Sequence, residues 1–257
     1  MAGLFRKSTA LFLAAALIGG CAGNDKEEGI TETIQHAAAE AQKKSDYPSA
    51  ALHYRNLHQK HPEDLGVLLE LAKALRYGGA AGEAVKVMEA KWKSFAELTP
   101  YLLELSKAKL AAGMASDAIG YLKIAIEKDS GNWEAYSAMG ISYDVLQQYD
   151  KAMEAYRIAN ELSPNNPVIL NNMAISAAQQ GKIKMAIATL KQASKISRKN
   201  PQIRQNLALF HGIKGDFDEA EAISKMDLDE ETVRNNLAFY YLFHKKKKST
   251  PAKRPLR

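Results

Sequence analysis

Residues Asn132 to Asn166 read NWEAYSAMGISYDVLQQYDKAMEAYRIANELSPNN, and the spacing of small and bulky residues in this stretch recurs along most of the chain. With Trp133 counted as position 1, a 34-residue step in both directions finds alanine at position 20 in six frames: Ala50, Ala84, Ala118, Ala152, Ala186 and Ala220. Position 8 is small in the same frames: Ala38, Ala72, Ser106, Gly140, Ala174 and Ala208. Because the two helices of a helix-turn-helix unit cross where these positions meet, only small side chains allow close packing there. The sequence therefore predicts six consecutive helix pairs, from about Thr31 to Ile223.

This frame resembles the tetratricopeptide repeat, a helix-turn-helix unit of 34 residues. The remaining signature positions of the quoted stretch also carry acceptable residues: Tyr136, Met139, Tyr143, Tyr156, Ala159 and Pro164. The resemblance implies an all-α superhelical solenoid in which each repeat packs only on its neighbours. We expect about six repeats over residues 31–228 and a capping helix over residues 229–244.

Several local signals refine this expectation. Glycine at position 15 of four repeats predicts a left-handed residue where the first helix ends: Gly79, Gly113, Gly181 and Gly215. Asn166-Pro167 and Asn200-Pro201 predict capped helix starts.

In the second repeat, Lys91 replaces a small residue at position 27 and predicts looser packing. The apolar residues of the capping helix recur at helical spacing and are expected to cover the open end of the solenoid: Val233, Leu237, Tyr240 and Tyr241.

The N-terminal residues predict an exported protein. Arg6 and Lys7 precede a short apolar run from Ala10 to Ile18, which is too short to span a bilayer but suits a secretory signal over residues 1–20. The run Leu17-Ile18-Gly19-Gly20-Cys21 resembles a bacterial lipobox. That resemblance implies that Cys21 is lipidated and that residues 21–30 form the lipidated N-terminus and a polar tether. Ala22 follows the cysteine in place of the aspartate that resembles an inner-membrane retention signal, which favours the periplasmic side of the outer membrane. The alternative is an ordinary secretory signal with an incidental cysteine.

The formal charge of +6 is concentrated at the two ends of the chain. Two basic residues lie in the predicted signal and seven in residues 245–257, which leaves 26 basic against 29 acidic residues elsewhere. No basic groove for nucleic acid is therefore expected. The C-terminal segment, residues 245–257, has no apolar periodicity and two prolines, so we expect it to be disordered. It either contacts anionic lipid or cell-wall polymers or is simply solvated.

The first-helix positions that line the concave face of such solenoids carry candidate binding residues. An asparagine series can hold the backbone of an extended peptide, since a carboxamide both donates and accepts hydrogen bonds: Asn172, Asn206 and Asn236. Neighbouring apolar positions would complete a groove: Ile141, Val145, Ile175, Leu209 and Ile213. The alternative is that the apolar side chains are buried between repeats and that the asparagines cap or bridge helices.

The sequence carries no motif for catalysis, cofactor or metal. Nucleophile elbows, phosphate loops and HExxH motifs are absent, and Cys21 is the only cysteine. His53, His58 and His61 have a spacing that does not bring three rings onto one ion. Asp227 and Asp229 are explained by the polarity of the following helix. We expect a non-enzymatic protein.

A lipobox, in-frame repeats and a final helix with the sequence NNLAFYYL together resemble the tetratricopeptide lipoproteins of the tight-adherence (Tad, or Flp) pilus assembly system. The segment from Asn200 to Phe243 carries the specific part of this likeness. The resemblance implies a pilotin-like adaptor whose partner is an outer-membrane secretin or another pilus component. The alternative is a scaffold lipoprotein of another envelope machine, such as type IV pilus or outer-membrane protein assembly.

Overall fold

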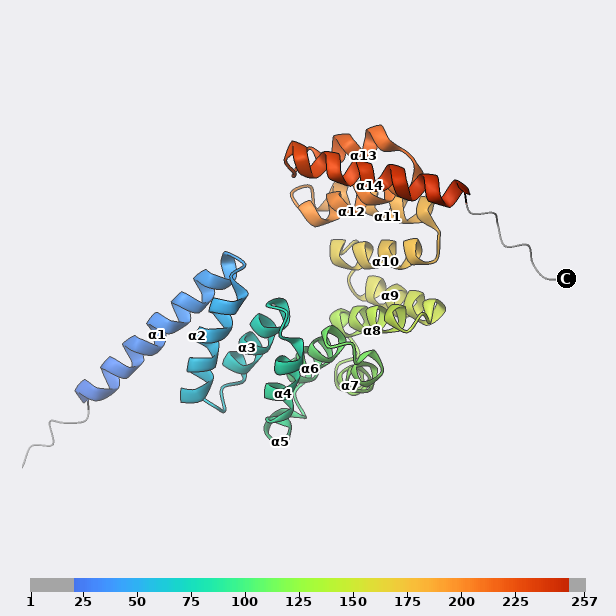
Figure 1. Cartoon of the computed structure of the whole chain (residues 1–257). Helices are drawn as coiled ribbons and strands as arrows, with labels where there is room; N and C mark the ends of the chain where they lie inside the picture. The colour runs from blue at the N-terminus through green and yellow to red at the C-terminus, as the bar shows by residue number, and fades with distance from the viewer. Residues whose placement is uncertain (1–20, 250–257) are drawn as a thin grey trace, which may run out of the picture.

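The computed structural model describes residues 21–249, and this part of the chain is helical throughout, with no strand (Figure 1). The helices are α1 (Cys21–Lys43), α2 (Tyr47–Lys60), α3 (Leu65–Tyr77), α4 (Ala81–Glu89), α5 (Trp92–Phe95), α6 (Thr99–Ala111), α7 (Ala115–Lys128), α8 (Trp133–Val145), α9 (Tyr149–Leu162), α10 (Pro167–Gln179), α11 (Ile183–Ile196), α12 (Pro201–Lys214), α13 (Phe217–Ser224) and α14 (Glu230–Ser249). None of these helices is both long and apolar enough to cross a membrane.

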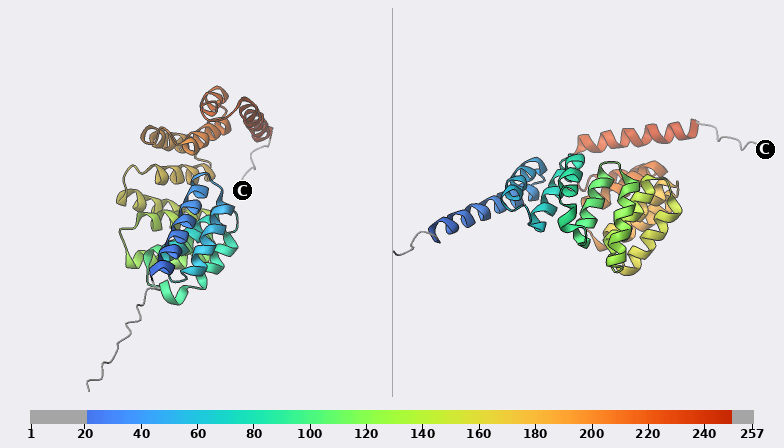
Figure 2. Two further views of the ribbon diagram at one scale, coloured as in Figure 1. Left: turned by 90° about the vertical axis from the view of Figure 1, so that its left-hand side faces the viewer. Right: turned by 90° about the horizontal axis from the view of Figure 1, so that it is seen from below.

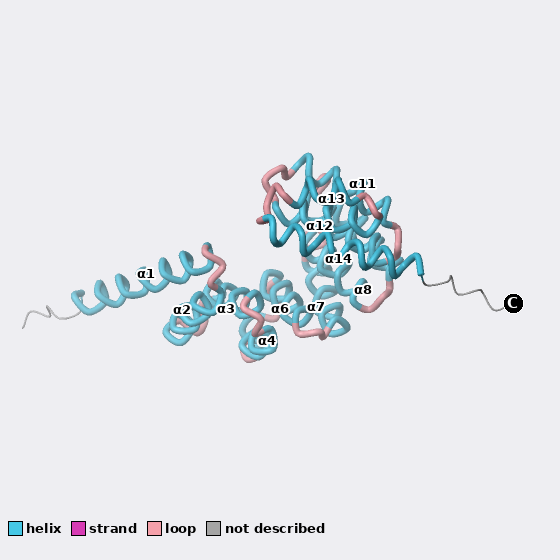
Figure 3. The backbone as a smooth tube through the Cα atoms, turned by 45° about the horizontal axis from the view of Figure 1, so that its top comes forward, coloured by secondary structure: helices cyan, strands magenta, loops and turns pink. Residues whose placement is uncertain are grey.

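The helices form six antiparallel pairs that stack into a tetratricopeptide-repeat superhelical solenoid, as the sequence predicts. The pairs are α1/α2, α3/α4, α6/α7, α8/α9, α10/α11 and α12/α13, and α14 follows as an unpaired last helix. Short loops join the helices (Figure 3), and the direction of the stack turns between the N-terminal and C-terminal repeats (Figure 2). We call the surface formed by the first helices of the pairs the inner face.

The predicted crossing points lie at the centre of each pair. All six alanines at position 20 have no exposed surface, and the position-8 residues are equally enclosed. In the fourth repeat Tyr156 of α9 packs directly over Gly140 of α8. The small residues therefore set the distance between the helices of each pair, as the 34-residue frame predicts.

The first helix of every pair ends in a left-handed residue at position 15. The four predicted glycines have φ between 76° and 100°. The same position is held by Ser45 (φ 60°) in the first repeat and by Gln147 (φ 57°) in the fourth. The turn geometry is therefore common to all six repeats, and two of them adopt it without glycine.

We expect Gln147→Gly to raise the free energy of unfolding by about 1 kcal/mol. A side chain in the left-handed region costs about 1–2 kcal/mol, and the larger unfolded-state entropy of glycine offsets part of this gain. Urea denaturation followed by circular dichroism measures the change. Gln148→Gly is the matched control, because Gln148 has φ −91° and glycine relieves no left-handed strain there, so it should not give the same gain. Equal effects of the two substitutions would contradict the argument.

The ends of the described chain differ from the expected boundaries. The polar stretch expected as a tether is the first part of α1, which begins at Cys21, since its lysine and glutamates are good helix formers. The last helix extends into the segment expected to be disordered and ends at Ser249. The predicted signal, residues 1–20, and the tail residues 250–257 lie outside the described residues.

The second repeat is not loosely packed around Lys91, in contrast to the expectation. The helix breaks after Glu89, and the Lys91 side chain turns outward to Glu63 (Nζ–Oε1 2.6 Å). The short α5 then fills the space with aromatic rings: Phe95 is buried against Tyr101, whose hydroxyl donates to the Met88 carbonyl (2.5 Å). A change of helix direction thus compensates for the missing small residue.

The two aspartates before α14 have different roles. Asp229 accepts hydrogen bonds from the Thr232 backbone N–H and hydroxyl (both 2.8 Å), so it caps α14 as helix polarity predicts. Asp227 instead forms a bidentate ion pair with Arg204 of α12, with one N–O distance of 2.8 Å. This pair lowers the pKa of Asp227. It ties the loop before α14 to the sixth repeat, a contact that the sequence analysis missed.

Candidate protein-binding surface

A hollow of about 400 Å³ on the inner face is formed by four consecutive first helices, α3, α6, α8 and α10. We call it the inner hollow. The residues that line it are Arg76, Tyr77, Lys107, Leu110, Ala111, Trp133, Glu134, Ser137, Ala138, Ile141, Val168 and Asn172. The lining shifts from the C-terminal end of α3, at Arg76 and Tyr77, to the N-terminal part of α10, at Val168 and Asn172, so the hollow crosses the stacked helices obliquely. Figure 1 shows these four helices following one another along the bend of the solenoid.

Apolar side chains in the inner hollow are accessible to solvent. Tyr77 is 54% and Val168 52% exposed, while Ile141 between them is half-buried. Arg76 lies over the ring of Tyr77 at 4.4 Å from its centroid, which holds the ring in place. Accessible apolar groups with polar neighbours are the composition expected of a surface that binds an amphipathic or extended polypeptide segment.

Charged pairs connect successive repeats along the rim of the hollow. Arg76 of α3 donates to Glu104 of α6 (Nε–Oε1 2.9 Å), and this pair is largely buried. Burial raises the pKa of Glu104, although the neighbouring Arg76 opposes the rise. Lys107 of α6 pairs in turn with Glu134 of α8 at 2.7 Å, in a more exposed position. The rim is therefore charge-balanced, and its geometry depends on how neighbouring repeats are stacked.

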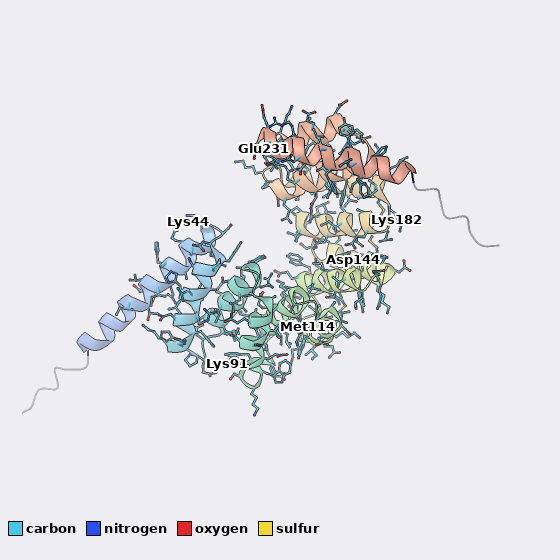
Figure 4. All side chains as sticks on the ribbon, viewed as in Figure 1. Lys44, Lys91, Met114, Asp144, Lys182 and Glu231 are labelled. Carbon is cyan, nitrogen blue, oxygen red and sulfur yellow. The ribbon has the colours of Figure 1, made fainter. Side chains whose placement is uncertain are left out.

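Asp144 is a buried carboxylate at the end of α8 (Figure 4). It accepts hydrogen bonds from the hydroxyls of Tyr156 (2.9 Å) and Ser176 (2.7 Å), which belong to α9 and α10. Burial raises its pKa, and the two hydrogen bonds partly counteract this effect. Because its two oxygens are engaged by neighbouring helices, Asp144 acts as a structural link between the fourth and fifth repeats.

The three asparagines proposed from the sequence occupy different environments. Asn172 lines the inner hollow and donates from Nδ2 to the Ser137 hydroxyl (3.2 Å). Asn206 donates from Nδ2 to Oδ1 of Asn171 (2.8 Å) on the preceding first helix. Asn236 is half-buried on α14. Asn172 and Asn206 therefore bridge helices, which is the alternative that the sequence left open, and each retains a carbonyl oxygen for a further hydrogen bond.

The five proposed apolar residues separate into groups. Ile141 belongs to the inner hollow, and Val145, which ends the same helix, is 54% exposed. Ile175 and Ile213 line a second hollow of about 350 Å³ together with Phe243 of α14. Ile175, Ile213 and Leu209 also pack against the core of the fifth and sixth repeats. The structure thus divides the single groove expected from the sequence into two neighbouring hollows.

The sequence analysis missed the N-terminal half of the inner hollow. Arg76, Tyr77 and Lys107 stand at positions 12, 13 and 9 of their repeats, which are concave-face positions in the 34-residue frame. The signal was therefore present. The asparagine series favours the C-terminal repeats instead, where the amides of Asn172 and Asn206 are engaged with neighbouring helices.

Metal chemistry has no evident site among residues 21–249. No group of three or more His, Cys, Asp or Glu side chains in this part of the chain could hold an ion together. His211 is buried, and its Nδ1 lies 2.9 Å from Asp216 in the turn between α12 and α13. That contact joins two helices of one repeat and is a local packing interaction.

Comparisons with known proteins agree with this architecture. The tetratricopeptide-repeat family model matches residues 133–166. No curated protein matches the chain. Among solved structures, a thermophilic TPR protein of Thermus thermophilus is similar, with 21% identity over 68% of this chain and 97% of that chain, and a TM-score of 0.61. MamA (residues 41 to the end) from Desulfovibrio magneticus RS-1 is similar at 16% identity over 66% and 96% of the chains, with a TM-score of 0.51. The chain therefore has the fold of the tetratricopeptide-repeat proteins.

Proposed function

We propose that this protein is a non-enzymatic adaptor that binds a segment of a partner protein in the inner hollow. The observation that carries the proposal is the meeting of exposed apolar groups and polar side chains from four successive repeats in one concavity. Tyr77 and Val168 offer accessible apolar surface, and Asn172 retains a free carbonyl oxygen toward a bound backbone. An amphipathic or extended segment satisfies both requirements.

The finer proposal is a lipid-anchored, pilotin-like adaptor of the Tad/Flp pilus system. Its supports are the lipobox resemblance that ends at Cys21 and the likeness of the segment from Asn200 to Phe243 to the lipoproteins of that system. In this role the lipid on Cys21 would hold the protein at the periplasmic face of the outer membrane. The inner hollow would then bind an outer-membrane secretin during its assembly.

Val168→Glu tests the inner hollow in the host. The substitution should abolish capture of the secretin and reduce its heat-resistant multimer in outer-membrane fractions, because a charge would occupy the apolar part of the hollow. It should leave the fold intact, since Val168 is half exposed and a carboxylate in the first turn of α10 is favourable. Val168 is preferable to the bridging asparagines, whose removal would also break contacts between helices.

Leu52→Glu is the matched control, because Leu52 of α2 is 62% exposed and lies outside the inner hollow. It should leave the secretin multimer unchanged. If deletion of the whole gene leaves a normal secretin ring in the outer membrane, the pilotin role is wrong. If deletion removes the ring but Val168→Glu does not, the role stands and the inner hollow is not the binding site.

A further inference from the structure

The last helix, α14, closes the solenoid with only one of its faces. Val233 and Tyr240 are buried against the sixth repeat. Tyr240 lies directly over Gly212 of α12, where an added Cβ would come within 2.3 Å of the ring. Tyr241, expected to be covered, is 54% exposed and contacts Phe217 with its ring tilted (ring centroids 3.9 Å apart). The docking of α14 is therefore close along one side of the helix.

Another face of α14 is apolar and open. Phe239 and Leu242 recur at i and i+3, so they lie on one side of the helix, and their exposed fractions are 56% and 68%. Phe243, 41% exposed, lies at the border of this face, where it also lines the second hollow. Terminal helices of repeat proteins normally present a polar outer face. Both views of Figure 2 place α14, drawn in red, at the edge of the molecule. The apolar face is thus available to another surface.

The basic residues that follow this apolar face in the sequence indicate what kind of surface the face contacts. The helical backbone of α14 continues through Lys245 to Lys248, directly after the exposed aromatic residues. Three further basic residues follow in the sequence, Lys253, Arg254 and Arg257. Aromatic side chains beside a run of lysines are typical of helices that lie in the interface of an anionic bilayer. Seven positive charges would strengthen such contact with acidic headgroups.

A second copy of the chain fits this face less well. In an antiparallel pair centred on the apolar residues 239–243, the lysine-rich end of one helix would lie opposite Arg234 and Asn235 of the other. In a parallel pair the lysines would lie opposite one another. The parallel arrangement supplies no anions for the lysines, and the antiparallel one offers only Glu230 and Glu231, one turn beyond Arg234, whereas acidic lipid headgroups can contact the whole run.

We propose that α14 is a membrane-contact helix that lies on an anionic lipid surface. Phe239 and Leu242 enter the boundary between headgroups and acyl chains, and the basic end of the helix pairs with the headgroups. This contact is separate from the predicted lipid on Cys21, which lies at the other end of the described chain (Figure 1). It also does not depend on the inner hollow.

Leu242→Trp in the full chain places a fluorescent reporter on the proposed contact face. We expect its emission to be quenched by brominated phospholipids in vesicles that contain phosphatidylglycerol, but not in phosphatidylcholine vesicles. Added salt should reduce the quenching by screening the lysines. Leu52→Trp is the control, because Leu52 is as exposed but lies on α2, so its added fluorescence should stay unquenched. Both variants have the same N-terminus. Binding to vesicles through that end alone would therefore give no difference in quenching between them.

Replacing Lys245, Lys246, Lys247 and Lys248 by glutamine in the Leu242→Trp protein should weaken binding to the acidic vesicles by about 100-fold or more. Circular dichroism checks that the helical fold is retained. Three results would overturn the proposal: no quenching on acidic vesicles, equal quenching on neutral vesicles, or a protein dimer, detected by light scattering, whose formation the Leu242→Asp substitution abolishes. The last result would assign the face to a second copy of the chain.

Discussion

Arg76→Met is expected to lower the free energy of unfolding at neutral pH by about 3–5 kcal/mol. Arg76 and Glu104 pair across α3 and α6, and their side chains are only 14% and 12% exposed. Removing the guanidinium leaves an ionised carboxylate buried without its counterion. The loss should appear in urea denaturation as a lower midpoint.

The pH dependence of this loss identifies its cause. Burial already raises the pKa of Glu104 above its ordinary value of 4.5, and the loss of Arg76 should raise it further. In the variant, the folded state therefore binds the proton more tightly than the unfolded state. Its deficit should be largest at neutral pH and should shrink as the pH falls through the raised pKa toward 4.5. A deficit that is independent of pH would point instead to lost packing over Tyr77.

Two further variants test whether the stability loss comes from the buried charge of Glu104. Arg55→Met removes a pair with the same sequence separation, Arg55 with Glu83, whose side chains are 37% and 45% exposed. It should change stability by less than about 1 kcal/mol, because exposed ion pairs contribute little. The double variant Arg76→Met/Glu104→Leu should recover most of the stability lost in Arg76→Met, since it leaves no charge buried.

Gly140→Ala is expected to cost about 1–3 kcal/mol, because it overpacks the crossing of α8 and α9. The added Cβ would lie 2.5 Å from Cε1 of Tyr156. That ring is 1% exposed, and its hydroxyl donates to Asp144, so it cannot move aside without breaking a buried hydrogen bond. Thermal unfolding and urea denaturation both measure the effect.

Gly120→Ala provides the matched control in the neighbouring repeat. Gly120 lies in the interior of α7, and no heavy atom lies within 4 Å of its added Cβ. Alanine should stabilise this helix by roughly 0.5–1 kcal/mol. If both glycines tolerate alanine equally, the close approach at Gly140 does not limit the packing of the fourth repeat.

Features that depend on one helix pair could be predicted from the sequence. The small residues at positions 8 and 20 predict the pairs, because steric fit at a crossing involves residues close in sequence. The caps are equally local: Asn166 and Asn200 accept backbone N–H groups of the helices that they precede, as predicted. Position 15 marks the turn in each repeat, although Gln147 shows that the geometry does not require glycine.

The repeat pattern was not enough to predict which face of α14 is buried and which is exposed. The lysine run and the aromatic residues were visible in the sequence, but periodicity alone did not show that Val233 and Tyr240 would be buried while Phe239 and Leu242 would stay open. That division depends on how α14 settles on the sixth repeat, where the space above Gly212 admits the ring of Tyr240.

The amino-acid sequence by itself determined the all-α solenoid, its helix pairs and its turns, because these depend on contacts within a 34-residue unit. The tertiary structure alone decided which side chains of different repeats meet. Arg76 reaches Glu104, and Asn206 reaches Asn171, only through the rotation between successive repeats. That rotation is a small angle set by packing at each interface, and it accumulates along the stack. For this reason the repeat frame marks the concave-face positions, but only the structure shows which of them meet in the inner hollow.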